Sequence, residues 1–122
     1  MQHAVNWYAG WSLILAAFLA GAVIGLRFAQ EEFLGGYASW RRRLLRLGHI
    51  AAAALGLINV VYAISPAPSA GWRAAGASIG LAAGAVAMPA VCFLSAWHKP
   101  MRAFFFIPVC MLAAAVALII AG

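Results

Sequence analysis

Residues 74–97 read AAGASIGLAAGAVAMPAVCFLSAW, a run of 24 residues without Asp, Glu, Lys or Arg. At 1.5 Å per residue, a helix of this length measures about 36 Å and crosses the hydrocarbon core of a bilayer, which is about 30 Å thick. A helix is the expected conformation because lipid offers no hydrogen-bond partners to an open backbone. This run therefore predicts a transmembrane helix.

Three further apolar runs of similar length occupy most of the remaining chain. Together the predicted spans cover residues 6–28, 44–64, 74–97 and 102–121. The connections are short, so consecutive helices are expected to be antiparallel. We predict an all-α, polytopic membrane protein, a single membrane domain over residues 1–122 with four transmembrane helices in an up-down-up-down bundle.

The composition agrees with this interpretation and excludes several classes of protein. Only 8% of the residues are charged and 67% are hydrophobic, whereas roughly a quarter of a soluble domain is charged. The chain is therefore not expected to be a soluble enzyme, a disordered tail or a nucleic-acid-binding domain. Its net charge of +6 is interpreted as a report on membrane orientation, because Lys and Arg concentrate in cytoplasmic connections.

The basic residues predict which side of the membrane each connection occupies. Seven of the eight Lys and Arg residues lie in or beside the first and third connections, and only Arg73 lies in the second. The positive-inside rule then places the first and third connections in the cytoplasm and both termini outside, in a bacterial inner membrane. Tryptophans are expected at the membrane interfaces, and all five lie near the predicted span ends: Trp7, Trp11, Trp40, Trp72 and Trp97.

Small residues predict where the helices pack. Lipid is as apolar as leucine, so transmembrane helices associate through close backbone approach and interhelical hydrogen bonds. Such stripes form seams inside the bundle or surfaces for another subunit, and the pattern leaves both alternatives open. The residues assigned to packing are Gly21, Gly25, Gly56, Asn59, Gly76, Gly80 and Gly84.

Prolines inside two spans leave backbone carbonyls without their helical donors. Pro89 frees the carbonyl of Ala85, and Pro108 frees that of Phe104. Counted from the cytoplasmic ends of their spans, Asn59 and Ala85 lie at about 22 Å and about 18 Å depth. We therefore expect the Asn59 amide to donate to the region of the Ala85 carbonyl.

The first connection carries most of the positive charge. Residues 29–43 read AQEEFLGGYASWRRR, and their apolar residues recur every three or four positions. This spacing predicts an interfacial helix broken at Gly35-Gly36. The arginines that follow are expected to bind anionic lipid headgroups or an acidic partner surface, and they are Arg41, Arg42, Arg43 and Arg46.

No Asp, Glu, Lys or Arg lies in the middle of a predicted span, which argues against ion-coupled transport and proton pumping. We expect no enzymatic activity, no catalytic residue, no metal site and no bound cofactor. The first hypothesis is a non-catalytic accessory or assembly subunit of a larger membrane complex, for example a respiratory or photosynthetic one. Two alternatives stay open: an electron-transfer protein binding haem b or quinone through His49 and His98, and a transporter of an uncharged solute or lipid.

Overall fold

The computed structural model describes the backbone of residues 2–66 and 70–122, and the side chains of these residues from Ala4 onward. Every regular element in the described part of the chain is helical, which confirms the predicted all-α class. The long helices are α1 (Gln2–Phe28), α2 (Trp40–Ile64), α3 (Trp72–Trp97) and α4 (Phe106–Ala121). Two 3₁₀ segments lie in the connections, η1 (Phe33–Gly35) and η2 (Lys99–Phe105).

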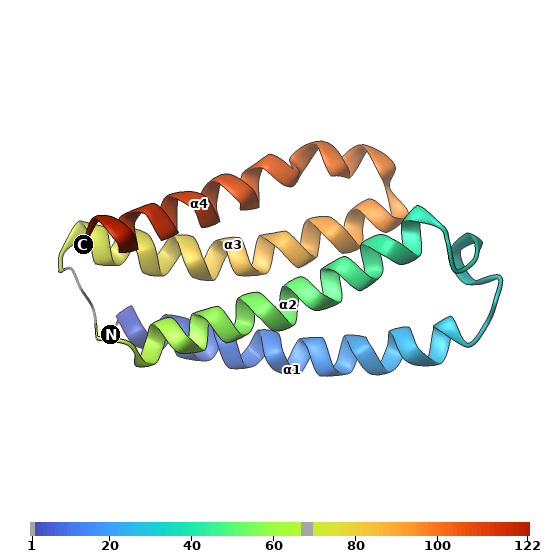
Figure 1. Ribbon diagram of the computed structural model, residues 1–122, viewed down its shortest axis with the longest axis horizontal. Helices are drawn as coiled ribbons and strands as arrows, with labels where there is room; N and C mark the ends of the chain where they lie inside the picture. The colour runs from blue at the N-terminus through green and yellow to red at the C-terminus, as the bar shows by residue number, and fades with distance from the viewer. Residues whose placement is uncertain (1, 67–69) are drawn as a thin grey trace.

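The four helices run antiparallel to their neighbours in sequence and lie side by side (Figure 1). Helix α3 occupies the central position, because it packs against α1, α2 and α4. Both chain ends lie at one end of the molecule, and the connections that contain η1 and η2 lie at the other (Figure 1). Four segments are long and apolar enough to cross a membrane, so the chain is a multi-pass membrane protein.

Helix α2 begins at Trp40, four residues before the predicted start of the second span. The reason is a helix cap, since the Ser39 side chain accepts a hydrogen bond from the Arg42 backbone N–H at 3.2 Å. Serine is among the preferred N-cap residues because its short side chain satisfies a donor of the first turn. Hydropathy alone excluded the three arginines of this turn from the predicted span.

The predicted interfacial helix in the first connection is wrong. Between α1 and α2 the chain forms only the short 3₁₀ segment η1. Leu34 has φ 51°, Gly35 has φ 87° and Gly36 has φ 97°, so three consecutive residues have positive φ values. A right-handed helix cannot continue through such residues, and the connection reverses direction here instead.

Pro108 lies in the first turn of α4, rather than inside a longer helix as predicted. The α-helix begins at Phe106, and the preceding seven residues form η2. A proline ring clashes with the carbonyl four residues before it in an α-helix, which here is the carbonyl of Phe104. The 3₁₀ geometry of η2 avoids that clash, while Pro89 does lie inside α3.

Close backbone contacts hold neighbouring helices together. A Cβ built on Gly10 of α1 would lie 2.7 Å from the Gly56 carbonyl oxygen of α2, and one built on Gly56 would lie 2.9 Å from the Gly10 oxygen. On α3, Cβ atoms built on Gly76, Gly80 and Gly84 would each approach side chains of α4 within 3 Å. Four predicted packing glycines therefore lie in contacts within the chain itself, Gly56, Gly76, Gly80 and Gly84, and Gly10 joins them without having been predicted.

Candidate functional site

A buried polar cluster joins three helices near the end that carries the termini. The Asn6 Nδ2 atom of α1 donates to the Asn59 Oδ1 atom of α2 at 2.7 Å and to the Ser78 carbonyl of α3 at 3.1 Å. The Ser78 hydroxyl donates in turn to the Asn6 Oδ1 atom. Buried polar groups are costly unless they are hydrogen-bonded, so this cluster fixes how α1, α2 and α3 meet.

Asn59 also reaches α3, but not at the predicted acceptor. Its Nδ2 atom donates to the Leu81 carbonyl at 3.2 Å and to the Leu55 carbonyl of its own helix at 2.9 Å. Leu81 lies one helical turn before the predicted acceptor, Ala85. The extra turn at the start of α2 explains this difference. It adds four residues before Asn59, so Asn59 lies about 6 Å farther from the connection end than predicted. Asn59 therefore meets a residue of α3 that is also farther from that end.

Arg42 is an internal clamp of the first connection. It is only 2% exposed, and its guanidinium donates to the carbonyls of Phe33 at 2.7 Å, of Glu31 at 3.1 Å and of Gln30. The guanidinium carbon also lies 4.8 Å from the centre of the Phe28 ring, a favourable cation–π distance. Arg42 therefore binds the first connection, and its prediction as a headgroup ligand is corrected.

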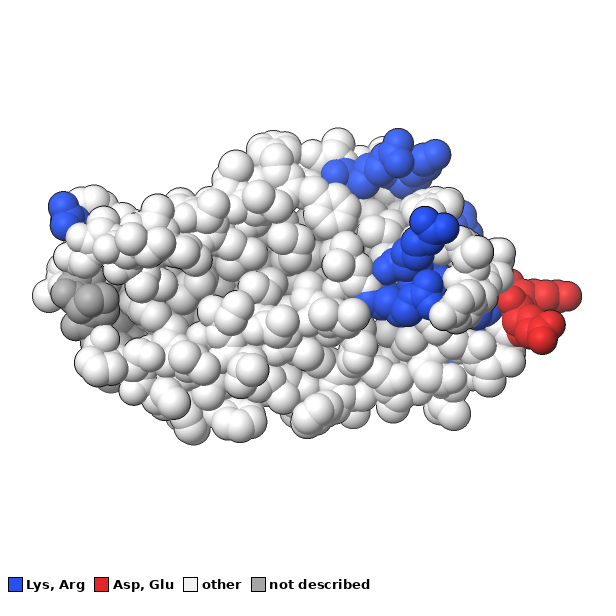
Figure 2. All heavy atoms as spheres, in the orientation of Figure 1, with Lys and Arg blue, Asp and Glu red and all other residues white. Residues whose placement is uncertain are grey.

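The other predicted headgroup arginines lie at the surface of the same end. The Arg41 guanidinium carbon lies 5.6 Å from the centre of the Trp40 ring. Arg43 donates to the Ala38 carbonyl at 2.9 Å, and Arg46 donates to the Tyr37 carbonyl at 3.4 Å. Figure 2 shows basic side chains gathered at this end of the molecule, with a single one at the opposite end.

The two histidines of the haem hypothesis occupy different environments. His98 is exposed and ends α3, whereas His49 is half-buried at the contact between α1 and α2. A Cβ built on Gly21 would lie 2.8 Å from the His49 Cε1 atom and 3.3 Å from its Nε2 atom. The Nε2 edge of the ring therefore lies against α1, and haem ligation at that atom would require α1 to move away.

The described residues contain two buried side-chain polar atoms without a hydrogen-bond partner, His49 Nδ1 and Ser95 Oγ. Ser95 lies on α3 and is fully buried. The two cysteines are free thiols, Cys92 buried and Cys110 exposed. No group of three His, Cys, Asp or Glu residues suitable for a metal ion is found in the described part of the chain.

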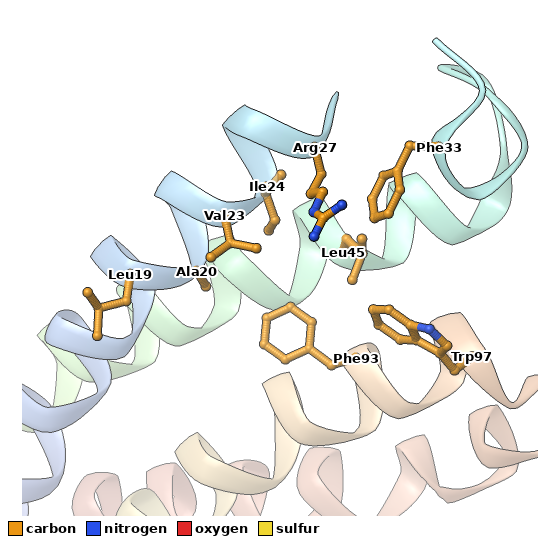
Figure 3. Close-up of a pocket in the computed structure, with 9 residues that line it drawn as sticks. All are labelled: Leu19, Ala20, Val23, Ile24, Arg27, Phe33, Leu45, Phe93 and Trp97. Atoms are coloured by element: carbon orange, nitrogen blue, oxygen red, sulfur yellow. The ribbon is translucent and has the colours of Figure 1, made fainter. Parts of the chain in front are cut away.

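An apolar groove lies between α1 and α3, with α2 beneath it (Figure 3). Its volume is about 610 Å³. Arg27 and Phe33 lie beside each other toward the connection end, and Phe93 and Trp97 of α3 form the facing wall (Figure 3). We call this hollow the α1–α3 groove, and its lining residues are Leu19, Ala20, Val23, Ile24, Arg27, Phe33, Leu45, Phe93 and Trp97.

No protein-family model, curated protein or solved structure matches this chain.

Proposed function

We propose that this protein is a non-catalytic accessory or assembly subunit that holds a transmembrane helix of another protein in its α1–α3 groove. The observation that carries the proposal is the groove itself. Its walls are mainly apolar side chains, which belong to three helices and the first connection. Concave surfaces of this kind accept large side chains from a neighbouring helix, whereas a convex helix face offers only ridge contacts.

The chemistry of the groove specifies the partner. Phe33, Phe93 and Trp97 provide broad aromatic walls, and Ala20 leaves space between them. The exposed Arg27 is the one charged residue among the lining residues. A complementary helix carries bulky apolar residues along one face and an acidic or polar residue at the level of Arg27, since an unpaired charge in an interface is costly.

The proposal includes an orientation in a bacterial inner membrane. Seven basic residues lie in or beside the two connections at one end of the molecule, and Arg73 lies in the first turn of α3 at the opposite end. Under the positive-inside rule, the connection end faces the cytoplasm and both termini face outward. The α1–α3 groove then lies in the cytoplasmic half of the membrane.

Two matched substitutions on α1 test the proposed partner site. Ala20 lines the groove, whereas Ala22 is exposed on a different face of the same helix. We expect Ala20→Phe to fill the groove and to weaken partner binding by much more than tenfold, that is, by well over about 1.4 kcal/mol in affinity. Ala22→Phe adds the same side chain toward lipid and should leave partner binding unchanged.

The measurement is quantification of companion chains after tagged protein is extracted from its native membrane in mild detergent. A stoichiometric companion in the wild type and in Ala22→Phe, but not in Ala20→Phe, supports the proposal. A wild-type chain that purifies alone contradicts it, as does a companion that both variants retain.

The haem or quinone alternative stays a second candidate because the buried His49 Nδ1 atom has no partner among the described residues. A cofactor site beside His49 would use this atom or displace the contact with Gly21. The absorption spectrum and the organic extract of the same purified protein test it. A haem or quinone that is lost in His49→Ala favours this candidate, and a colourless sample without quinone rejects it.

A further inference from the structure

A second hollow lies at the connection end, between the start of α2 and η2. Its volume is about 620 Å³. Residues more than 50 positions apart in the sequence meet here, because the first and third connections lie at the same end of the bundle (Figure 1). We call it the cation pocket, and its lining residues are Trp40, Arg43, Leu44, Lys99, Arg102 and Phe105.

Three of these six lining residues are cations, and none is an acid. The chain has only two acidic residues, and both of these, Glu31 and Glu32, line a separate hollow with Gln30 and Phe33. The charges of Arg43, Lys99 and Arg102 are therefore not balanced within the pocket. Like charges held together repel one another, and an anion placed among them relieves that repulsion.

The cations keep donors available for such an anion. Lys99 and Arg102 are exposed. The Arg43 guanidinium donates through its Nη2 atom to the Ala38 carbonyl. A guanidinium has five N–H donors arranged to match the oxygens of a phosphate. The remaining donors of Arg43 can therefore bind an anion together with Lys99 and Arg102.

The opposite side of the pocket is apolar. Leu44 and Phe105 are half-buried there, and Trp40 is 39% exposed. The pocket lies where the spans Trp40–Ile64 and Lys99–Ala121 both begin. This is the depth of the lipid headgroups, at which tryptophan side chains concentrate. A ligand that fits has a phosphate on one side and a hydrocarbon chain on the other.

We propose that the cation pocket binds an anionic phospholipid of the adjacent leaflet, with its phosphate among Arg43, Lys99 and Arg102. Its acyl chains pass Leu44 and Phe105 into the bilayer. Basic pockets between transmembrane helices recognise such headgroups. This site differs from the one predicted from sequence, because it uses only Arg43 of the four arginines and adds two cations of the third connection. It does not rest on the partner helix proposed for the α1–α3 groove.

Native mass spectrometry of the detergent-solubilised full chain tests the site. Three probes are titrated separately: phosphatidylglycerol as the anionic lipid, phosphatidylcholine as the zwitterionic lipid, and inorganic phosphate. We expect the wild type to bind phosphatidylglycerol at least about tenfold more tightly than phosphatidylcholine, and more tightly than inorganic phosphate. A cation close to an anionic headgroup contributes about a fivefold increase in affinity. Because Lys99 and Arg102 both line the pocket, replacing both with alanine should weaken phosphatidylglycerol binding about 25-fold.

The control variants are Arg41→Ala, at the same end but outside the pocket, and Arg73→Ala in the first turn of α3 at the opposite end. Both should change phosphatidylglycerol binding less than about twofold. Equal affinity of the wild type for the two lipids overturns the proposal. A loss of phosphatidylglycerol binding in Arg73→Ala as large as that in the double variant also overturns it. Inorganic phosphate binding as tightly as the lipid indicates a soluble-anion site and also overturns it. If the double variant does not fold, the single variant Arg102→Gln tests the site, and its affinity for phosphatidylglycerol is expected to fall about fivefold.

Discussion

Replacing Gly56 with alanine is expected to lower the free energy of unfolding by about 2–3 kcal/mol. The added Cβ would lie 2.9 Å from the Gly10 carbonyl oxygen, and 3.1 Å from both Ile14 Cγ1 and Leu13 Cβ of α1. Neither a backbone carbonyl nor a Cβ atom can rotate away as the end of a flexible side chain can. The substitution therefore forces α1 and α2 apart, and many close contacts along their crossing are weakened together.

Gly25→Ala is the matched control, because both glycines lie in transmembrane helices and were predicted to pack. A Cβ built on Gly25 meets nothing within 4 Å in the described part of the chain, apart from its own helix backbone. Alanine should stabilise α1 there by up to about 1 kcal/mol through its helix propensity. Reversible unfolding in mixed detergent micelles measures both variants. Equal stability of Gly56→Ala and wild type would contradict the close crossing of α1 and α2.

Replacing Arg42 with alanine is expected to lower the free energy of unfolding by about 2–3 kcal/mol, because charged hydrogen bonds to three carbonyls are lost. Those carbonyls belong to Gln30, Glu31 and Phe33, so the first connection loses the clamp that holds it against α2. Arg42→Lys should recover little of this, since a single ammonium cannot reproduce the separate donors of a guanidinium. Arg41→Ala is the control, because Arg41 contacts the Trp40 ring at the surface. This substitution should lower the free energy of unfolding by less than about 1 kcal/mol.

Limited proteolysis measures whether Arg42→Ala loosens the first connection itself. A glutamate-specific protease has two target residues in the chain, Glu31 and Glu32, and both lie in the clamped connection. We expect cleavage to rise at least about tenfold in Arg42→Ala, which corresponds to about 1.4 kcal/mol of easier local opening. Unchanged cleavage in Arg42→Ala, or an equal rise in Arg41→Ala, would refute the clamp.

The fold could be predicted from sequence because membrane thickness sets a simple requirement. Each span needs about 20 apolar residues, and uninterrupted runs such as residues 74–97 satisfy it without any knowledge of packing. The helix limits were harder to predict, since hydropathy identifies the apolar part of a helix and misses a polar first turn such as the one at the start of α2. Ser39, the cap of α2, was the missed signal, and it also explains why Asn59 meets Leu81 instead of Ala85.

The candidate sites were less predictable because they depend on which helix faces touch. Nothing near Asn6 in the sequence indicates that it bonds Asn59 and Ser78, which follow it by 53 and 72 positions. Likewise, the arginine run predicts a basic surface, but only the fold turns Arg42 inward and brings Lys99 and Arg102 to Arg43. The α1–α3 groove has no sequence signature, since all its lining residues except Arg27 are ordinary apolar residues, and they come from three helices and one connection.

Cysteine labelling in intact cells tests most directly that the chain crosses the membrane four times with its basic end inside. In a background without Cys92 and Cys110, single cysteines replace Ala38 in the first connection, Ala70 in the second and Gly122 at the end of the chain. We predict that a membrane-impermeant maleimide labels the cysteines at 70 and 122 in intact cells, and reaches the cysteine at 38 only after permeabilisation. Labelling at 38 in intact cells, or protection of either other position, would contradict this topology.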